Sequence, residues 1–275
     1  NLRSNEKLGK LTKPLHIPRH SKLLAYSDTN QVCTFRTIWD LLFVPLEIVR
    51  VSFDDDENLF VHIQTIQDSD LSELVIPSLD FHINADWKMI SFFQENLTNK
   101  LQGVTLLDQK GNIRDYSKKN IEYKGFDEEE LALPLPKGGQ SAYCLLQEYF
   151  AFEKKFNFIS LKNIDLSNFS GRKLTLKFNF SILPKKLRTM TQHNLMLNCV
   201  PIINLFTKIS EPIKLSDKKV DQLLIADKKK DSYTEIHSID SITISEPGGS
   251  KPKKIRDFST ATENQEYDEN ENSNL

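Results

Sequence analysis

The sequence predicts an α+β fold in which β-strands dominate and helices are few and short. Several segments are rich in β-branched and aromatic residues, which fit the pleated, half-buried surface of a sheet. LFVHIQTI, at residues 59–66, alternates between apolar and polar side chains, as a strand with one buried face does. Helical spacing of apolar residues is clearest in the segment that starts at Asp86.

Composition divides the chain into four stretches. Prolines and paired glycines interrupt residues 125–140, which indicates a joint between two β-rich subdomains. The end of the chain is acidic and almost free of apolar residues, which is typical of a linker or a disordered tail. The expected boundaries are residues 1–15 for a polar linker, 16–136 for the first subdomain, 137–245 for the second, and 246–275 for the tail.

In the first subdomain, strands are expected on both sides of one helix. Pro45 should mark a sheet edge or a break between two strands within residues 32–53, because proline cannot donate a ladder hydrogen bond. Asp86 is the expected N-cap of a helix over about residues 86–101, since its carboxylate can accept hydrogen bonds from free backbone N–H groups. Further strands are expected at residues 59–66, 74–85 and 104–107.

The second subdomain is expected to open with a helix over about residues 141–151 and to continue as strands. YTEIHSIDSITIS, at residues 233–245, shows the clear alternation of a half-buried strand. Pro201 interrupts an otherwise extended segment at residues 193–209. Further strands are expected at residues 154–161, 173–182 and 220–225.

Composition also argues against several classes of function. The net charge is −2 with both signs interspersed, so no surface for nucleic acid is expected. The three cysteines form no CxxC pair, which argues against a zinc site or a disulfide framework and suits a reducing cytosol. The most apolar stretch, residues 38–49, contains charges and a proline and is shorter than the roughly 20 residues that span a bilayer. No signal peptide and no direct membrane insertion are therefore expected.

Two residue pairs resemble sites of chemistry, and each has a simpler interpretation. His16 and His20 have the spacing of a helical metal pair, but Pro18 between them favours an extended segment. His193 and Cys199 could act as a base and a thiol nucleophile, although Cys199 lies in an apolar run that predicts a buried, inert side chain. We predict no metal ligand and no cofactor-binding residue.

A second class of function remains open, because carbohydrate-binding or carbohydrate-cleaving β-sandwich modules are also β-rich and aromatic. Glu148 and Glu153 flank an aromatic cluster, and paired carboxylates can serve glycoside hydrolysis. No other residue pattern indicates a sugar cleft. We therefore predict no catalytic residue and keep the carbohydrate module as the alternative.

Two apolar segments, residues 143–161 and 194–215, carry the strongest signal in the chain. Four phenylalanines fall between Phe150 and Phe158. Such density indicates either a packed core or a buried interface, since both are rich in aromatic residues. The candidate core or interface residues are Tyr149, Phe150, Phe152, Phe156, Phe158, Pro201, Asn204, Leu205 and Phe206.

These two segments resemble the TssF (ImpG) family of bacterial type VI secretion systems. YCLLQEYFAFEKKFNFISL, at residues 143–161, is similar to a family run of EYF-aromatic followed by KF-aromatic-F. NCVPIINLFTKISEPIKL, at residues 198–215, is similar to a second signature in which Cys-x-Pro leads to Asn-Leu-Phe and Pro-Ile-x-Leu. Weaker echoes follow in family order over residues 16–244: HIPRHSKL, CTFRTIWDLLFVPLEI, GFDEEELALPLP and YTEIHSIDSI. Glu153 departs from the family, which usually has proline there.

The resemblance implies a structural role and a fold similar to the wedge proteins of contractile-phage baseplates. It implies a wedge shared with TssG, TssE, TssK and a second copy of the chain, placed around the spike hub and supporting sheath assembly. It also implies a cytoplasmic location, docked at the inner-membrane-anchored secretion complex, without catalysis or cofactor. Because the chain starts at Asn1 and lacks the family's terminal regions, we expect a segment of a longer protein.

Overall fold

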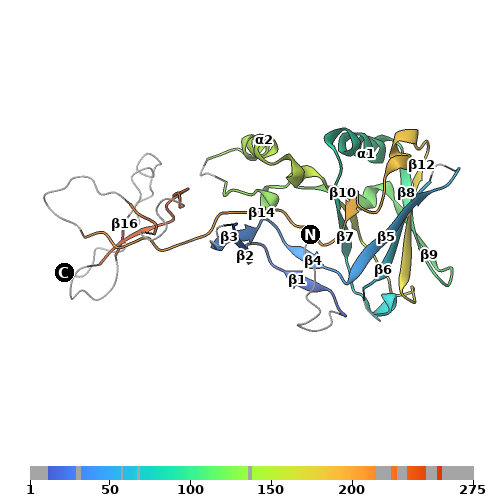
Figure 1. The fold of residues 1–275 in the computed structure, drawn as a ribbon, viewed down its shortest axis with the longest axis horizontal. Helices are drawn as coiled ribbons and strands as arrows, with labels where there is room; N and C mark the ends of the chain where they lie inside the picture. The colour runs from blue at the N-terminus through green and yellow to red at the C-terminus, as the bar shows by residue number, and fades with distance from the viewer. Residues whose placement is uncertain are drawn as a thin grey trace, which may run out of the picture. The chain divides into compact units, whose positions relative to one another are not determined.

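The computed structural model describes residues 12–28, 32–56, 58–66, 69–135, 138–214, 224–227, 234–245 and 253–255. The chain forms two compact units, Asn1–Phe206 and Thr207–Leu275. The first unit contains both α-helices and the three largest sheets of the described chain (Figure 1). The β-dominated α+β prediction is thus confirmed.

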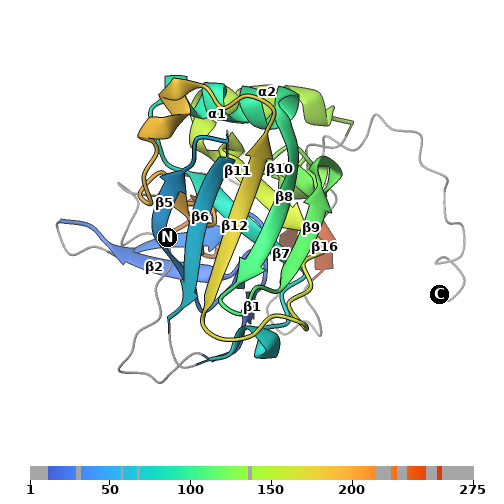
Figure 2. The ribbon, with the colours of Figure 1, turned by 90° about the vertical axis from the view of Figure 1, so that its right-hand side faces the viewer.

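A five-stranded antiparallel sheet forms one layer of the first unit (Figure 2). Its order is β5-β6-β12-β8-β9, so β12 lies between two strands from much earlier in the chain. The predicted alternation at residues 59–66 is confirmed, because the inward side chains of β6 are buried and their neighbours are half-buried. The strands are β5 (Leu46–Phe53), β6 (Asn58–Thr65), β8 (Leu101–Asp108), β9 (Ile113–Ser117) and β12 (Lys173–Phe180).

A four-stranded antiparallel sheet forms the facing layer, in the order β10-β11-β7-β13. Asp80 joins three of its strands, because its carboxylate accepts hydrogen bonds from Ser160 Oγ at 2.5 Å and Lys124 Nζ at 2.8 Å. This ion pair is largely buried and ties the centre of the sheet to its β10 edge. The strands are β7 (Ser78–Ile83), β10 (Ile121–Lys124), β11 (Phe158–Lys162) and β13 (Leu195–Met196).

The main core lies between these two sheets, and helix α1 (Trp87–Asn99) contributes to the same buried cluster. Phe178 from β12, Phe81 from β7 and Phe93 from α1 are all fully buried there. Asp86 caps the helix as predicted, since its carboxylate accepts the backbone N–H of Met89 at 2.9 Å. Burial of large aromatic and aliphatic side chains on both layers is the dominant stabilising contribution.

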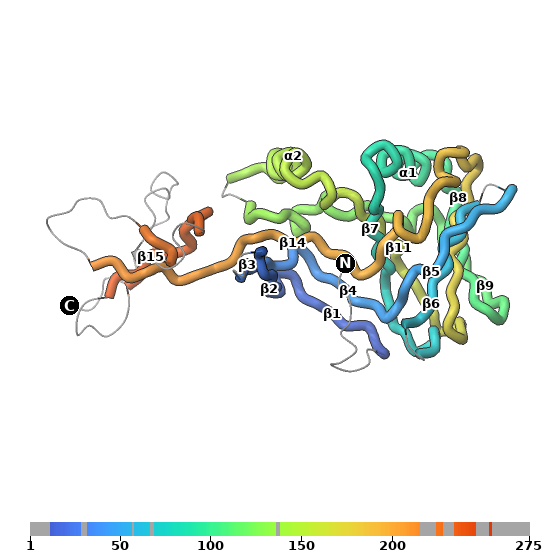
Figure 3. Tube along the Cα trace, in the orientation of Figure 1, coloured from blue at the N-terminus to red at the C-terminus, as the bar shows by residue number. Residues whose placement is uncertain are grey.

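Shorter elements complete the first unit, and Figure 3 traces their course along the chain. Strand β1 (Leu15–Ile17) pairs with β4 (Leu41–Phe43), and a three-stranded sheet has the order β14-β3-β2. Its strands are β2 (Lys22–Tyr26), β3 (Val32–Thr37) and β14 (Ile202–Ile203). The other elements are helix α2 (Ser141–Ala151) and the 3-10 turns η2 (Leu71–Glu73), η3 (Lys118–Asn120), η4 (Glu128–Glu130), η5 (Glu153–Phe156) and η6 (Lys185–Thr189).

The predicted joint at residues 125–140 does not separate two sheets. β11 and β12, which follow it, pair with strands that precede it in both layers. The segment connects β10 to α2 within one unit, and the division between compact units falls after Phe206. The prolines and glycines of this segment therefore belong to a connecting loop within one unit. Such loops use the same turn residues as linkers between domains.

Other predicted elements differ in extent. The strand expected over residues 154–161 begins only at Phe158, because a 3-10 turn occupies Glu153–Phe156. In the second unit, the strand expected over residues 233–245 is limited to β15 (Ile242–Ile244), which pairs with β16 (Lys253–Ile255) inside the predicted tail. The strand expected at residues 220–225 and most of that tail lie outside the described residues. Within the described ranges, no helix has the length and apolar character needed to cross a bilayer.

His82 on β7 gives the fold a pH-dependent test. Its ring centroid lies 4.7 Å from that of Phe158, and burial lowers the pKa of His82 from 6.5 to about 4. The folded chain keeps the imidazole neutral where the unfolded chain binds a proton, so the free energy of unfolding should fall as the pH decreases from 6.5 to about 4. Chemical denaturation at several pH values should show a shallower fall for His82→Gln. Equal slopes for the two proteins would contradict this assignment.

Candidate interaction surface

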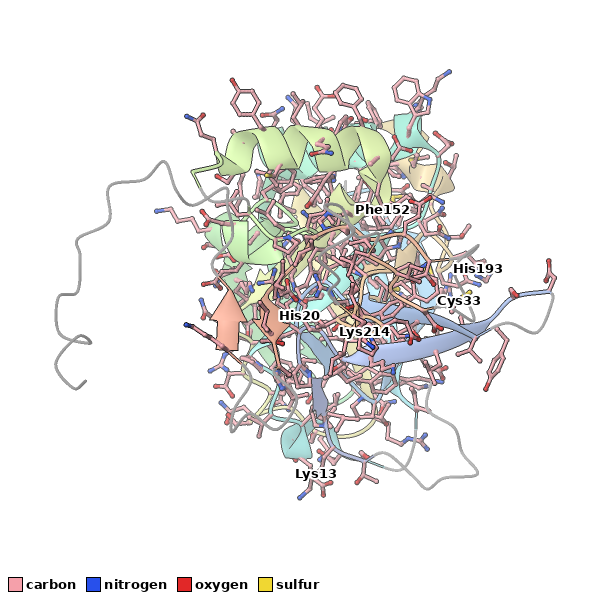
Figure 4. The ribbon with its side chains drawn as sticks, turned by 90° about the vertical axis from the view of Figure 1, so that its left-hand side faces the viewer. Lys13, His20, Cys33, Phe152, His193 and Lys214 are labelled. Carbon is pink, nitrogen blue, oxygen red and sulfur yellow. The ribbon has the colours of Figure 1, made fainter. Side chains whose placement is uncertain are left out.

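Helix α2 exposes its large apolar side chains and buries its charged one, which is the reverse of an ordinary surface helix. Glu148 is the one charged residue in Ser141–Ala151, and it is also the one residue of that helix that is buried. Large apolar side chains face outward: Tyr143 is 70% exposed, Leu146 55%, Tyr149 51% and Phe150 81%. Figure 4 shows aromatic rings projecting from α2 away from the rest of the ribbon. An amphipathic surface helix normally buries its apolar stripe, so this arrangement indicates a surface that meets another protein segment or another molecule.

A buried ion pair holds α2 in this orientation. Lys155, which follows the helix in η5, has a fully buried side chain, and its Nζ lies 2.5 Å from Glu148 Oε2. Lys155 Nζ also donates to the carbonyl of Gly125 at 2.9 Å. The second carboxylate oxygen of Glu148 accepts the backbone N–H groups of Ala132 at 2.7 Å and Leu133 at 3.2 Å. Both charges are thus paired and hydrogen-bonded, which burial of an ion pair requires.

The loop from Gly125 to Leu133 is the anchor to which the pair attaches. Gly125 has φ +101°, and a Cβ at this position would lie 2.8 Å from the carbonyl oxygen of Lys155, so both backbone angle and space require glycine. Glu130 accepts the backbone N–H groups of Gly125 and Asp127, which closes the loop on itself. Arg19 Nη2 donates to the carbonyl of Leu131 at 3.0 Å and joins the N-terminal strands to the same loop.

A chain of aromatic rings runs from the interior to the outer face of α2. The ring of buried Phe156 lies 5.0 Å from that of Phe126 and 5.7 Å from that of Tyr149. Tyr149 in turn meets Phe150 edge to face at 5.8 Å. Ring pairs at these separations are favourable beyond their buried area. The exposed face is therefore continuous with packed side chains.

A hollow lies at the C-terminal end of α2, where the helix gives way to η5. Residues Tyr149–Lys154 line it, and it is open to solvent. Phe152, labelled in Figure 4, contributes a side chain that is 41% exposed. Apolar side chains line the hollow together with one charge of each sign, Glu153 and Lys154.

The structure divides the predicted core or interface residues between the two roles. Phe156, Phe158 and Pro201 are buried, and Phe158 packs edge to face against Trp39 at 5.2 Å. Leu205 is half-buried. The remaining candidates are exposed: Tyr149, Phe150, Phe152, Asn204 and Phe206.

The residues that organise this surface were only partly visible in the sequence. Tyr143 and Leu146 lie on the same outward face as Phe150, but an apolar helix residue is ordinarily expected to be buried. Glu148 and Lys155 were not predicted to pair. A lone acid within an apolar helix, followed seven residues later by a lysine in an aromatic run, is the signal that could have indicated the contact.

The two residue pairs considered for chemistry, His16 with His20 and His193 with Cys199, lie in surroundings that do not favour reactivity. His16 Nε2 lies 3.5 Å from Asp40 at an exposed position, and His20 lies in the left-handed region at φ 65°. Burial raises the pKa of Cys199, whose Sγ contacts the carbonyl of Leu197, so its thiol is not activated. His193 is exposed. Across the described residues, no three His, Cys, Asp or Glu side chains are grouped to hold a metal ion.

Comparison with known proteins gives concordant results. A family model described as "Type VI secretion system, TssF" matches residues 1–273. Type VI secretion system component TssF1 of Pseudomonas aeruginosa is 23% identical over 273 residues, which cover 91% of this chain and 44% of that protein. A chain in the cryo-electron microscopy structure of a type VI secretion system TssK-TssF-TssG baseplate subcomplex matches with a TM-score of 0.71 and 26% identity, over 88% of this chain and 48% of that one. The chain thus spans less than half the length of both relatives.

The buried ion pair predicts a strong asymmetry between single and double substitutions. Lys155→Met should lower the free energy of unfolding by about 3–5 kcal/mol, because it leaves the Glu148 charge buried without a partner. Adding Glu148→Gln should recover much of that loss, since a neutral amide oxygen can still accept the Ala132 and Leu133 N–H groups. Urea denaturation measures both values. A double variant less stable than Lys155→Met alone would contradict the role of the pair.

Truncation of two phenylalanines in the same segment should lower the stability of the protein by very different amounts. Phe156→Ala should lower the free energy of unfolding by about 3–5 kcal/mol, because it leaves a cavity in the packed interior. Phe150→Ala should change it by less than about 0.5 kcal/mol, because its side chain already faces solvent. Thermal and urea denaturation compare the two variants. Equal losses of stability would show that Phe150 belongs to the core.

Proposed function

The chain belongs to the TssF family of the type VI secretion system, and we propose that it is a structural component of the baseplate. The outward aromatic face of α2 is the observation that carries this proposal. It presents apolar side chains to solvent on a helix that the Glu148–Lys155 pair fixes in place. Such a face suits a subunit that is covered by its neighbours in an assembly.

TssG-like and TssK-like subunits are the first partners that we propose. Support comes from the structural match to a chain in a TssK-TssF-TssG baseplate subcomplex. TssE, the spike hub and a second copy of this chain complete the proposed neighbours, on the strength of the family's wedge arrangement. Within the wedge, the chain would scaffold these subunits around the hub and support sheath assembly.

The role that we propose is non-enzymatic. The acid that a glycosidase would need, Glu148, is neutralised by Lys155 and by two backbone N–H groups. Glu153, its possible partner, is exposed and lines an open hollow. No observation favours the carbohydrate-binding or carbohydrate-cleaving alternative. We further propose that the protein works in the cytoplasm, docked at the inner-membrane-anchored secretion complex.

Co-expression tests the proposal. The full-length gene product should form a stable complex with the TssG-like and TssK-like subunits of the same system, as measured by size exclusion with light scattering. Phe150→Asp should weaken that complex about tenfold or more, because it buries a charge in an apolar contact. Val75→Asp is the matched control, since Val75 is 84% exposed on the loop between η2 and β7. Figure 2 shows that loop at the opposite end of the first unit from α2.

Two outcomes would contradict the proposal. A full-length protein that ignores both subunits would remove the baseplate role. A Val75→Asp variant that loses the complex as completely as Phe150→Asp would show that the effect of the charge is not specific to α2. Both variants should retain the melting temperature of the unmodified protein, because both sites are exposed.

A further inference from the structure

We infer that the outward face of α2 is a docking site for one amphipathic α-helix of a partner subunit, lying along α2. This inference rests on the proposed baseplate function and specifies the kind of partner at one of its surfaces. Five features of the surface support it: its fixed orientation, its exposed apolar area, the spacing of its side chains, the absence of charge on its stripe and the hollow at its end.

The outward orientation of the aromatic face is permanent. Rolling α2 to bury Tyr143 or Phe150 would pull Glu148 away from Lys155, which has no exposure to solvent. Separating a buried pair leaves two uncompensated charges, which is far more costly than leaving apolar side chains in water. Within the first unit the face therefore stays outward and open to a partner.

The apolar area that this face exposes is large enough to form much of a protein interface. Together the outward side chains of Tyr143, Leu146, Tyr149, Phe150 and Phe152 expose on the order of 600 Å², by the usual areas of such side chains. A typical monomer exposes no larger apolar patch than this, and one partner contributes about 800 Å² to an interface of standard size. One helix laid on this face would cover most of it.

The spacing of the outward side chains fits a helix. Tyr143, Leu146 and Phe150 are separated by three and four residues, so they form a single stripe along α2. Stripes of this spacing pack against a similar stripe on a second helix, whose side chains enter the gaps between them. An extended strand would present side chains at a repeat that does not match these gaps.

The outward stripe of α2 has no charged side chain, since the single charge of the helix points inward, and the two charges that line the hollow beside it, Glu153 and Lys154, are of opposite sign. It therefore offers no attraction to an acidic peptide or to nucleic acid. With Lys154 alone beside it, the stripe also lacks the several lysines and arginines that hold a helix at an anionic membrane surface. An apolar stripe on a protein helix is the remaining complement, and the hollow at Tyr149–Lys154 can accept one large apolar side chain from it.

Site-specific photocrosslinking tests the inference in the assembled complex of the full-length protein. A benzoylphenylalanine residue replaces Leu146 in one variant and Phe150 in another, and mass spectrometry locates the crosslinked residues. Leu146 and Phe150 are four residues apart on α2, or roughly 6 Å along its axis. On a partner helix the two crosslinked positions should also lie about four residues apart, within one apolar stripe. On an extended strand they would lie about two residues apart, because a strand rises about 3.3 Å per residue.

Each other outcome overturns the inference in a defined way. Crosslinks two residues apart would indicate a strand, and crosslinks to lipid would indicate a membrane surface. Crosslinks to the same protein would indicate a second copy or another segment of the full-length chain as the occupant. A complex that assembles without crosslinks from either position would leave the baseplate role intact and remove this docking site. Failure of the complex to form at all would instead remove the proposed function. The probe at Val75 is the control and should not reach the segment that residues 146 and 150 reach.

Discussion

The contact between Glu148 and Lys155 determines how the second helix is presented, and the surface depends on that contact. Most surface helices are held by a buried apolar stripe, whereas the one buried residue of α2 is a carboxylate with its ion pair and hydrogen bonds, beside the ring contact of Tyr149 with Phe156. Polar contacts of this kind are directional, because they require particular atoms at particular distances. The pair therefore fixes the rotation of α2 about its own axis, while its apolar side chains remain outside.

The rest of the first unit acts as the support for that contact. Gly125 follows β10 directly, so the anchor loop is attached to the four-stranded sheet at its edge. Lys155 lies in the turn before β11, which pairs with both β10 and β7. The loop that binds Glu148 and the turn that carries Lys155 are thus both attached to the four-stranded sheet. That sheet packs on the five-stranded layer through a common core. A face built in this way keeps its shape before a partner arrives, which lowers the entropic cost of association.

Local patterns in the sequence predicted local structure well. The alternation at residues 59–66 and the Asp86 cap are decided by near neighbours, and both are confirmed. The direction in which α2 faces could not be predicted in this way, because hydrophobicity alone places Phe150 inside. Its orientation is set by the contacts of Glu148 with Lys155 and with the backbone of Ala132 and Leu133, which lie 16 and 15 residues earlier in the chain. The segment at residues 125–140 was interpreted as a joint for the same reason, since its turn residues do not reveal which strands pair across it.

The position of β12 has a consequence for how the protein is made. This strand lies at the centre of the five-stranded sheet, between β6 and β8, yet it is the last of the five to be synthesised. Until residues 173–180 leave the ribosome, β6 and β8 each have an edge without its partner, next to side chains meant for the core. Closing such a long loop is slow, and open strand edges promote aggregation. During synthesis the chain is therefore prone to aggregate until β12 pairs with β6 and β8.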